Sequence, residues 1–267
     1  MNKTPQRIRL ETRIRVLDVV GIRNITPLMR RITVAGDDLE GFSSPGYADH
    51  IKVFFSQDAE NPILPLLGEN GLEFPAGSVR PDMRDYTPRN HDPVARTLDI
   101  DFVLHGDGPA SSWAAQAKAG QKLVIGGPRG SLVIPNAFDW YLLVGDETAL
   151  PAIGRRLEEL PEAARAVAII EVANAAEEQQ LSSSAKADIV WVHRDGAEAG
   201  RNDLLRQAVA AQADRFPTGE AYAFIATESG VSKSIRQFLV EERGFDNEWV
   251  KAAGYWLYGQ ADAHEPH

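Results

Sequence analysis

The pattern of hydrophobic residues changes near residues 136–139, and this change constrains the fold more than any other feature of the sequence. Before Pro135, short β-favouring runs are separated by Gly, Pro, Asn and Asp, whereas after it apolar strands alternate with helical segments. The first pattern is typical of antiparallel sheets and the second of parallel βαβ units. We therefore predict a β + α/β protein, with an antiparallel β-barrel at residues 1–137 and a parallel-sheet α/β domain at residues 138–267.

Residues 97–104 carry the clearest strand pattern of the first domain. Four apolar residues at every second position, from Leu98 to Leu104, predict a strand with one buried face. A short helix is expected at residues 111–119, opened by Ser111. Residues 61–81 are rich in Pro, Gly and Asn, and we expect a long excursion that covers a ligand. Further strands are expected at residues 14–20, 31–34, 51–55 and 122–125.

The second domain is expected to alternate strands and helices. Trp140–Val144 is a continuous apolar strand, and Glu147–Leu160 is predicted to be the helix that follows it. Strands at residues 166–172, 188–192 and 222–226 and helices at residues 204–213 and 232–242 complete the pattern. The polar residues 260–267 are predicted to form a disordered tail.

Composition excludes several classes of function. The formal net charge of -10 opposes binding to nucleic acid or anionic membranes, so an anionic ligand needs a local basic pocket. The chain has no cysteine, which removes disulfides, thiol nucleophiles and iron–sulfur clusters. Its six histidines lack paired ligand spacing, so no metal site is expected. No apolar stretch is long enough to cross a bilayer, and we expect a soluble, cytoplasmic protein.

The most specific short motif is Arg84-Asp85-Tyr86-Thr87, which precedes the strand at residues 97–104. Residues two apart share a face of a strand, so Arg84 and Tyr86 can address one extended ligand. The tetrad matches the Arg-x-Tyr-Ser/Thr motif of ferredoxin-reductase-like flavin barrels. There Arg84 would pair with a flavin phosphate, Tyr86 would lie against the isoalloxazine ring, and Thr87 would offer its hydroxyl. The alternative is an edge strand with a solvated Arg84 and a half-buried Tyr86.

Two glycine-containing turns follow this motif. His105–Ala114 is predicted to be a strand that enters a glycine turn and a helix start, where backbone N–H groups and the helix dipole suit a pyrophosphate. The alternative is an ordinary turn with Ser111 as the helix cap. Gly126–Ser131 is a tight turn that carries one cation, Arg129, between two strands.

In their order along the chain and in their residues, the segments Arg84–Thr87, His105–Ala114 and Gly126–Ser131 resemble the siderophore-interacting protein family. The resemblance continues in Asp49–Phe55, Gly145–Pro151 and Gly254–Trp256, and so reaches from about residue 49 to 256. It implies a ferredoxin-reductase-like protein with a Greek-key barrel that binds FAD and a second domain that admits NADPH or NADH. It also implies reduction of ferric siderophores inside the cell.

The resemblance assigns roles to individual residues. Tyr86 and Thr87 are the catalytic candidates, and Lys52 and Arg129 are candidates for binding the anionic ferric chelate. The alternative for each of these two cations is a surface salt bridge. Trp256 has the alternative role of a core residue. The residues expected at FAD are Arg84, Tyr86, Thr87, Asp101, Val103, His105, Pro109, Ala110 and Ser111 of the barrel, with Thr148 and Trp256 of the second domain.

The second domain carries weaker signals for a nucleotide. The turn Gly145–Thr148 follows the first parallel strand, at the sheet edge where ligands bind, but it lacks a glycine-rich fingerprint. Asp146 and Glu147 have the alternative role of capping a helix and complementing its dipole. Lys233 is expected to open a helix. The candidates for binding the 2′-phosphate of NADPH are Arg194, Lys233 and Arg236, although exposed helices carry such residues without any ligand.

A flavin explains how such a chain could reduce iron. FAD accepts a hydride from a nicotinamide as two electrons and passes them singly to Fe(III). Hard oxygen donors hold Fe(II) less strongly than Fe(III), so reduction loosens the chelate. Two alternatives stay open at this point: a flavin- or siderophore-binding protein that a ferredoxin reduces, and a general flavin reductase.

Overall fold

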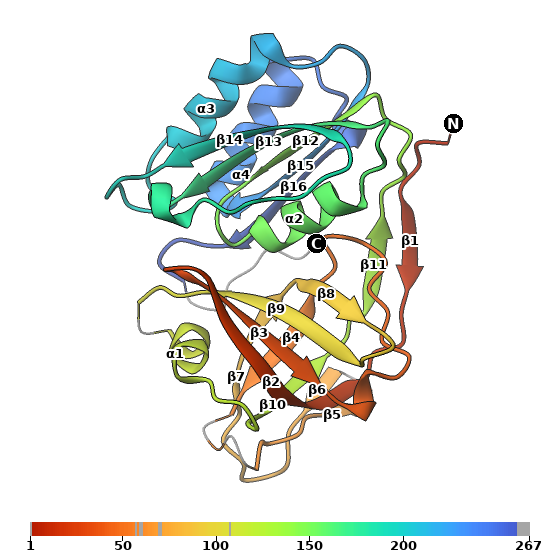
Figure 1. The fold of residues 1–267 in the computed structure, drawn as a ribbon, viewed down its shortest axis with the longest axis vertical. Helices are drawn as coiled ribbons and strands as arrows, with labels where there is room; N and C mark the ends of the chain where they lie inside the picture. Colours follow the sequence, from red (N-terminus) through yellow and green to blue (C-terminus); the bar gives the residue numbers. More distant parts are fainter. Residues whose placement is uncertain (1, 57, 59–60, 69–70, 107, 261–267) are drawn as a thin grey trace. The chain divides into compact units, whose positions relative to one another are not determined.

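The computed structural model describes residues 2–56, 58, 61–68, 71–106 and 108–260, and these residues form two compact units (Figure 1). One unit comprises Pro5–Ile134, and the other begins at Pro135 and includes the start of the chain up to Thr4. The first holds an antiparallel sheet and the second a parallel sheet. The predicted β + α/β class is confirmed.

A seven-stranded antiparallel sheet in the order β7-β4-β10-β2-β3-β9-β8 forms the first unit. Its two edge strands, β7 (Asp82–Tyr86) and β8 (Pro88–Asp92), are separated in sequence only by Thr87. One residue spans less than about 4 Å, so the sheet must curl until its edges meet at Thr87. The other strands are β2 (Ile14–Thr26), β3 (Met29–Ala35), β4 (Ile51–Phe55), β9 (Thr97–Val103) and β10 (Lys122–Gly126).

The interior of this curled sheet is filled by alternate residues of its strands. On β9, Leu98, Ile100 and Phe102 are fully buried in the core, as the period-2 pattern predicts. Helix α1 (Pro109–Gln116) adds Trp113, whose ring centroid lies 5.5 Å from that of Phe102. The helix therefore contributes to the same core as the barrel strands.

Helix α1 starts earlier than the sequence suggested. Gly108 is its N-cap and Pro109 its first residue, a position where proline has no helical N–H bond to lose. The prediction that Ser111 opens or caps the helix is therefore wrong, because Ser111 lies within the first turn.

Short strand pairs complete the first unit. β1 (Gln6–Arg9) pairs with β11 (Gly130–Val133). β5 (Leu66–Gly68) pairs with β6 (Gly71–Glu73), so the excursion at residues 61–81 contains a hairpin that its sequence did not predict.

The second unit is a five-stranded parallel sheet in the order β14-β13-β12-β15-β16. The chain begins in the centre at β12 (Trp140–Gly145), moves outward through β13 (Arg165–Val172) and β14 (Lys186–His193), and then crosses to β15 (Ala221–Glu228) and β16 (Val250–Trp256). The strand order therefore reverses between β12 and β15. Ligands of open α/β sheets bind at the carboxyl ends of the strands beside such a switch point.

Helices cover both faces of the parallel sheet (Figure 1). α3 (Leu204–Gln212) and α4 (Ser229–Gln237), which continues as a π-helical turn at Phe238–Glu242, bury apolar residues against Leu142 and Val144 of β12. α2 (Leu150–Glu159) lies on the opposite face, where the Arg156 guanidinium stacks 4.5 Å from the ring centroid of Tyr141.

Two helix starts differ from the prediction. α2 begins at Leu150 rather than Glu147, because the Ala149 N–H is bonded to the Asp146 carbonyl in a turn before the helix. α4 begins at Ser229, three residues before the expected start. Lys233 therefore lies in its second turn and does not open it. The tail predicted at residues 260–267 lies, except for Gln260, outside the described residues.

Candidate functional site

The Arg84–Thr87 motif lies where the two edges of the barrel sheet meet. Arg84 and Tyr86 belong to β7 and face the same side as their partners Val53 and Ile51 on β4. Thr87 is buried at the junction between β7 and β8. A side chain at this junction is fixed by both strands, so the motif occupies a well-defined position.

Tyr86 is half-buried and packs against the barrel core. Its ring centroid lies 4.4 Å from that of Phe102 and 6.3 Å from that of Phe55. Burial raises the pKa of the Tyr86 hydroxyl, although the nearby Arg84 charge opposes this shift. The side chain is therefore a neutral aromatic surface with a protonated hydroxyl, which suits contact with a flat ring system.

Arg84 is half-buried beside Tyr86, and its guanidinium donates a 2.7 Å hydrogen bond to the Met83 carbonyl. Its place two residues from Tyr86 keeps a cation next to an aromatic ring on one strand face. An extended ligand with a ring and a phosphate fits this pair.

Asp101 and Val103 lie on β9, but their environments differ. Asp101 is buried, and both of its carboxylate oxygens accept from the Arg31 guanidinium, at 2.7 and 2.8 Å. Arg89 of β8 approaches the same carboxylate at 3.9 Å. Asp101 is thus held in a buried ion pair with Arg31, whereas Val103 is a half-buried strand end.

The turn before α1 is tied together by Ser111. The His105 backbone N–H donates to the Ser111 hydroxyl at 2.9 Å, which closes the turn over the helix start. Ala110 and Ser111 are buried, Pro109 is half-buried, and the His105 side chain is exposed. Asp107 lies outside the described residues. The start of α1, where helices offer N–H groups to anions, is therefore bonded through Ser111 to the end of the preceding strand segment at His105.

Lys52 and the Gly126–Ser131 turn are neighbours. Lys52 of β4 is the register partner of Gly126 of β10, and Arg129 lies exposed three residues further on. The Lys52 ammonium group forms a 2.7 Å ion pair with Asp85 on β7. A salt bridge, the alternative considered for Lys52, is therefore present in the structure and neutralises part of its charge.

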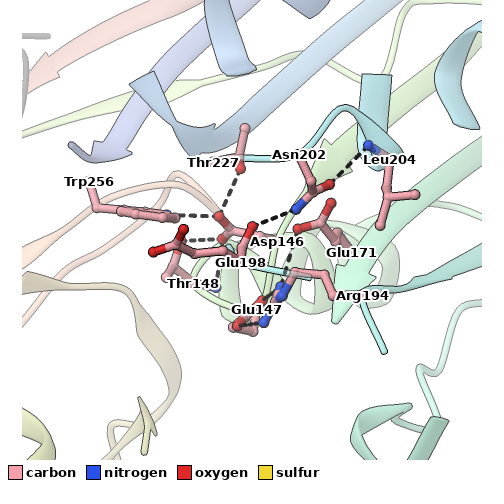
Figure 2. Close-up of polar contacts among 10 residues, drawn as sticks. All are labelled: Asp146, Glu147, Thr148, Glu171, Arg194, Glu198, Asn202, Leu204, Thr227 and Trp256. Carbon is pink, nitrogen blue, oxygen red and sulfur yellow. Dashed lines mark hydrogen bonds and ion pairs between the residues drawn. The ribbon is translucent and has the colours of Figure 1, made fainter. Parts of the chain in front are cut away.

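A buried carboxylate, Asp146, connects three strand ends of the second unit (Figure 2). One oxygen accepts from Thr227 Oγ1 at 2.7 Å and from Trp256 Nε1 at 2.8 Å. The other accepts from the Thr148 N–H at 2.9 Å and from the Thr148 hydroxyl. Asp146 and Thr148 directly follow β12, Thr227 lies in β15 and Trp256 in β16, so Asp146 holds together the carboxyl edge of the sheet at the switch point.

Burial raises the pKa of Asp146, and the charge of the adjacent Glu147 raises it further. The hydrogen bonds from Thr148, Trp256 and Thr227 act in the opposite direction, because they stabilise the ionised carboxylate. Asp146 does not cap α2, whose N-cap is Ala149 and has no side-chain cap bond; Asp146 instead accepts from Thr148 and Trp256.

Arg194 lies in an ion-pair cluster with two glutamates (Figure 2). Its side chain is buried, and its guanidinium pairs with Glu147 at 2.7 Å and with Glu171 at 3.2 Å. Burial by itself lowers the pKa of Arg194, but these two carboxylates raise it overall. The structure therefore places this cation in an internal ion-pair cluster, which does not favour a role at the 2′-phosphate.

The other two basic candidates lie on α4. Lys233 is exposed, and the Arg236 guanidinium is bonded to the Asn247 side chain.

Sequence reasoning missed residues that reach this edge from distant segments. Thr227 and Glu228 end β15, and Gly200 lies where an added Cβ would come within 2.6 Å of the Trp256 ring. The sequence could have indicated these residues only by their position, because the carboxyl ends of β12 and β15 must meet beside the switch point.

Among the described residues, no group of three or more His, Asp or Glu could hold a metal ion. Within the same ranges, no helix has the length and hydrophobicity to cross a membrane.

A curled antiparallel sheet followed by a parallel sheet with its central strand first is the ferredoxin-reductase-like fold. A ferredoxin NADP+ reductase structure from Neisseria gonorrhoeae shares this fold with a TM-score of 0.53, at 14% identity over 85% of this chain and 91% of that chain.

More specifically, the chain belongs to the siderophore-interacting protein family. Residues 18–132 match the siderophore-interacting FAD-binding domain, and residues 138–259 match the siderophore-interacting protein model. The chain is 37% identical to the NADPH-dependent ferric-chelate reductase of Escherichia coli K12, over 96% of this chain and 99% of that protein. It is 40% identical to a siderophore utilization protein from T. fusca, whose structure matches with a TM-score of 0.89 over 97% and 98% of the two chains. The predicted family, the oxidoreductase class and the FAD cofactor are confirmed.

Proposed function

We propose that this protein reduces ferric siderophores in the cytoplasm, takes its electrons from NADPH or NADH through FAD, and releases Fe(II). The observation that carries the proposal is the Arg84–Thr87 motif at the closure of a barrel that matches an FAD-binding domain. Similarity along nearly the whole chain to a ferric-chelate reductase supports the substrate class. In this proposal residues 1–137 are the FAD-binding domain and residues 138–267 the nucleotide-binding domain.

The residues of the barrel fit FAD by their chemistry. Arg84 would bind a phosphate through charge-assisted hydrogen bonds, and Tyr86 would present its neutral ring to the isoalloxazine. The buried Thr87 would hold its hydroxyl at one position next to the ring. FAD, when bound, supplies the conversion of a two-electron hydride into single electrons. The turn from His105 to Ser111 would bind the pyrophosphate through backbone N–H groups.

The same proposal assigns the substrate and the remaining cofactor contacts. Lys52 and Arg129 would attract an anionic ferric chelate, with Lys52 exchanging its Asp85 partner for the ligand. Fe(III) bound by hard oxygen donors becomes Fe(II) on receiving one electron, and the chelate then holds it less strongly. Thr148 and Trp256 of the second unit, and Asp101 and Val103 of β9, are the other residues that we propose to contact FAD.

Spectroscopy of the purified protein tests this proposal. The flavin absorbance should bleach on anaerobic addition of NADPH or NADH and recover on addition of a ferric siderophore, while a chromogenic ligand traps Fe(II). A flavin that neither nucleotide bleaches, but that a reduced ferredoxin does, would identify the ferredoxin-dependent alternative. Bleaching without recovery by any ferric chelate would contradict the proposal and favour a general flavin reductase.

A further inference from the structure

Arg15 of β2 is a cation at a core-facing position of the barrel sheet. The alternate buried residues at the start of this strand are Arg15, Leu17 and Val19, and Arg15 is only 3% exposed. Within the described part of the chain, its guanidinium forms no ion pair and donates only to carbonyl oxygens, among them those of Asp38 and Gly127, each at 2.9 Å. Buried charges are normally paired, so a buried cation that lacks a carboxylate partner points to a further role.

The guanidinium of Arg15 is nevertheless held in one place. Its central carbon lies 5.2 Å from the ring centroid of the buried Phe42, and its hydrogen bonds fix the edge of the group. Burial lowers the pKa of Arg15, although the charges of Asp38 and Glu11 oppose this shift. The side chain is therefore an ordered positive charge that a nearby anionic ligand would stabilise.

The Gly127 carbonyl that Arg15 binds belongs to the turn that carries Arg129. In the same turn, the Gly127 N–H donates to the Arg13 carbonyl at 3.1 Å, and the Arg129 carbonyl accepts from the Leu10 N–H at 3.1 Å. The turn is tight, because Gly127 has a φ of +90° and an added Cβ would lie 3.2 Å from the Arg129 nitrogen. The chain leading into β2 thus anchors this turn at three points, and Arg15 supplies the anchor that is a side chain.

This anchored turn presents a cation next to another cation. Arg129 is exposed and has no ion-pair partner among the residues that the structure describes. Lys52 is the register partner of Gly126, which ends β10 at the start of the turn. A turn whose backbone is already fixed loses less conformational freedom when Arg129 binds an anion.

We propose that Arg15 is a positioning residue for anionic ferric chelates, which fixes the Gly127 carbonyl and thereby holds the turn that presents Arg129 beside Lys52. This inference rests on the proposed function, because it concerns the substrate of the same reaction. A neutral ferric chelate gains little from Arg129, so the contribution of Arg15 depends on the charge of the ligand. Loss of Arg15 should weaken binding of an anionic chelate about fivefold and that of a neutral chelate less than about twofold.

Two substitutions test this role at different strengths. Arg15→Met removes every guanidinium bond, whereas Arg15→Lys keeps the charge and a donor but loses the planar fork that reaches the Asp38 and Gly127 carbonyls together. Arg96→Gln is the matched control, because Arg96 is more exposed and contacts the same 3-10 turn, Asp37–Leu39, through the Asp37 carboxylate. Each full-length protein is prepared with FAD, and its flavin content and thermal unfolding show that it is folded.

Calorimetry then measures the dissociation constants of a ferric tricatecholate, which is anionic, and of a neutral ferric trihydroxamate. A double-mutant cycle with Arg129→Gln tests whether Arg15 acts through the turn. We expect selective weakening of tricatecholate binding in Arg15→Met, a smaller loss in Arg15→Lys and no change in Arg96→Gln. Adding Arg15→Met to Arg129→Gln should weaken tricatecholate binding by less than about twofold, because the two residues act as one unit.

Equal weakening of both chelates overturns the inference, because it is the result of a merely structural role. Fully additive effects of Arg15→Met and Arg129→Gln also overturn it. If Arg15→Met does not fold, Arg15→Lys decides by the same two comparisons, and tricatecholate binding as tight as in the wild type then contradicts the role. A wild-type protein that binds neither chelate shows instead that the proposed function is wrong. Because binding is measured on the oxidised protein, failure of NADPH and NADH to reduce the flavin leaves the test of Arg15 intact.

Discussion

Removing the Asp146 carboxylate should destabilise the second unit strongly, and the structure allows the size of the effect to be worked out. In Asp146→Ala, the Thr148 and Thr227 hydroxyls can rotate towards other acceptors, but the Thr148 N–H and the Trp256 indole N–H cannot. Each of these rigid, part-buried donors costs up to about 1–3 kcal/mol when it is left without a partner. Relief of the buried charge offsets part of this cost. We expect a net loss of about 2–4 kcal/mol in the free energy of unfolding.

Denaturant unfolding followed by circular dichroism measures this loss, with Asp203→Ala as the control. Asp203 is exposed and makes no side-chain cap bond at the start of α3, so its removal should change stability by less than about 0.5 kcal/mol. A double-mutant cycle between Asp146→Ala and Trp256→Phe should give a coupling energy of about 1 kcal/mol. An Asp146→Ala protein within about 0.5 kcal/mol of the wild type would refute the reasoning, because the cluster would then carry no net stabilisation.

Three further predictions concern the flavin, the substrate and pH. Arg84→Ala should lose about 1.5–3 kcal/mol of FAD binding, measured as flavin content after purification, and full retention of FAD would contradict the phosphate role. Lys52→Gln should retain FAD but raise the KM for an anionic ferric chelate. Lys122→Gln, which breaks the exposed Lys122–Asp18 pair, should leave this KM unchanged. Equal KM values in the two variants would contradict a role of Lys52 in binding the chelate. Because the pKa of Asp146 is raised, the folded protein binds its proton more tightly than the unfolded chain, so this group lowers stability as pH rises above about 3.8 through the folded pKa. Asp146→Asn should flatten that part of the stability profile in thermal unfolding, and an unchanged slope would show that other groups cause it.

Local pattern in the sequence predicted the elements whose burial follows a simple period. The alternation at residues 97–104 became β9, and the apolar run at residues 140–144 became the central strand β12. The barrel followed by an α/β unit could also be read from the change of pattern near residue 136. Strand β8 could not, because Pro88–Asp92 is mostly polar and becomes a strand only by pairing with β9 at a sheet edge.

Sequence motifs alone identified the family and the segments that we propose to carry the flavin chemistry. Arg84 and Tyr86 are close in sequence, and their shared face follows from strand geometry. Which partners the polar groups of the second unit find was decided only by the tertiary structure. Asp146 binds Thr227 and Trp256, 81 and 110 residues away, and Arg194 pairs with Glu147 and Glu171. The physical reason is that strand order brings these ends together, and a local hydrophobic pattern specifies each strand but not its neighbours.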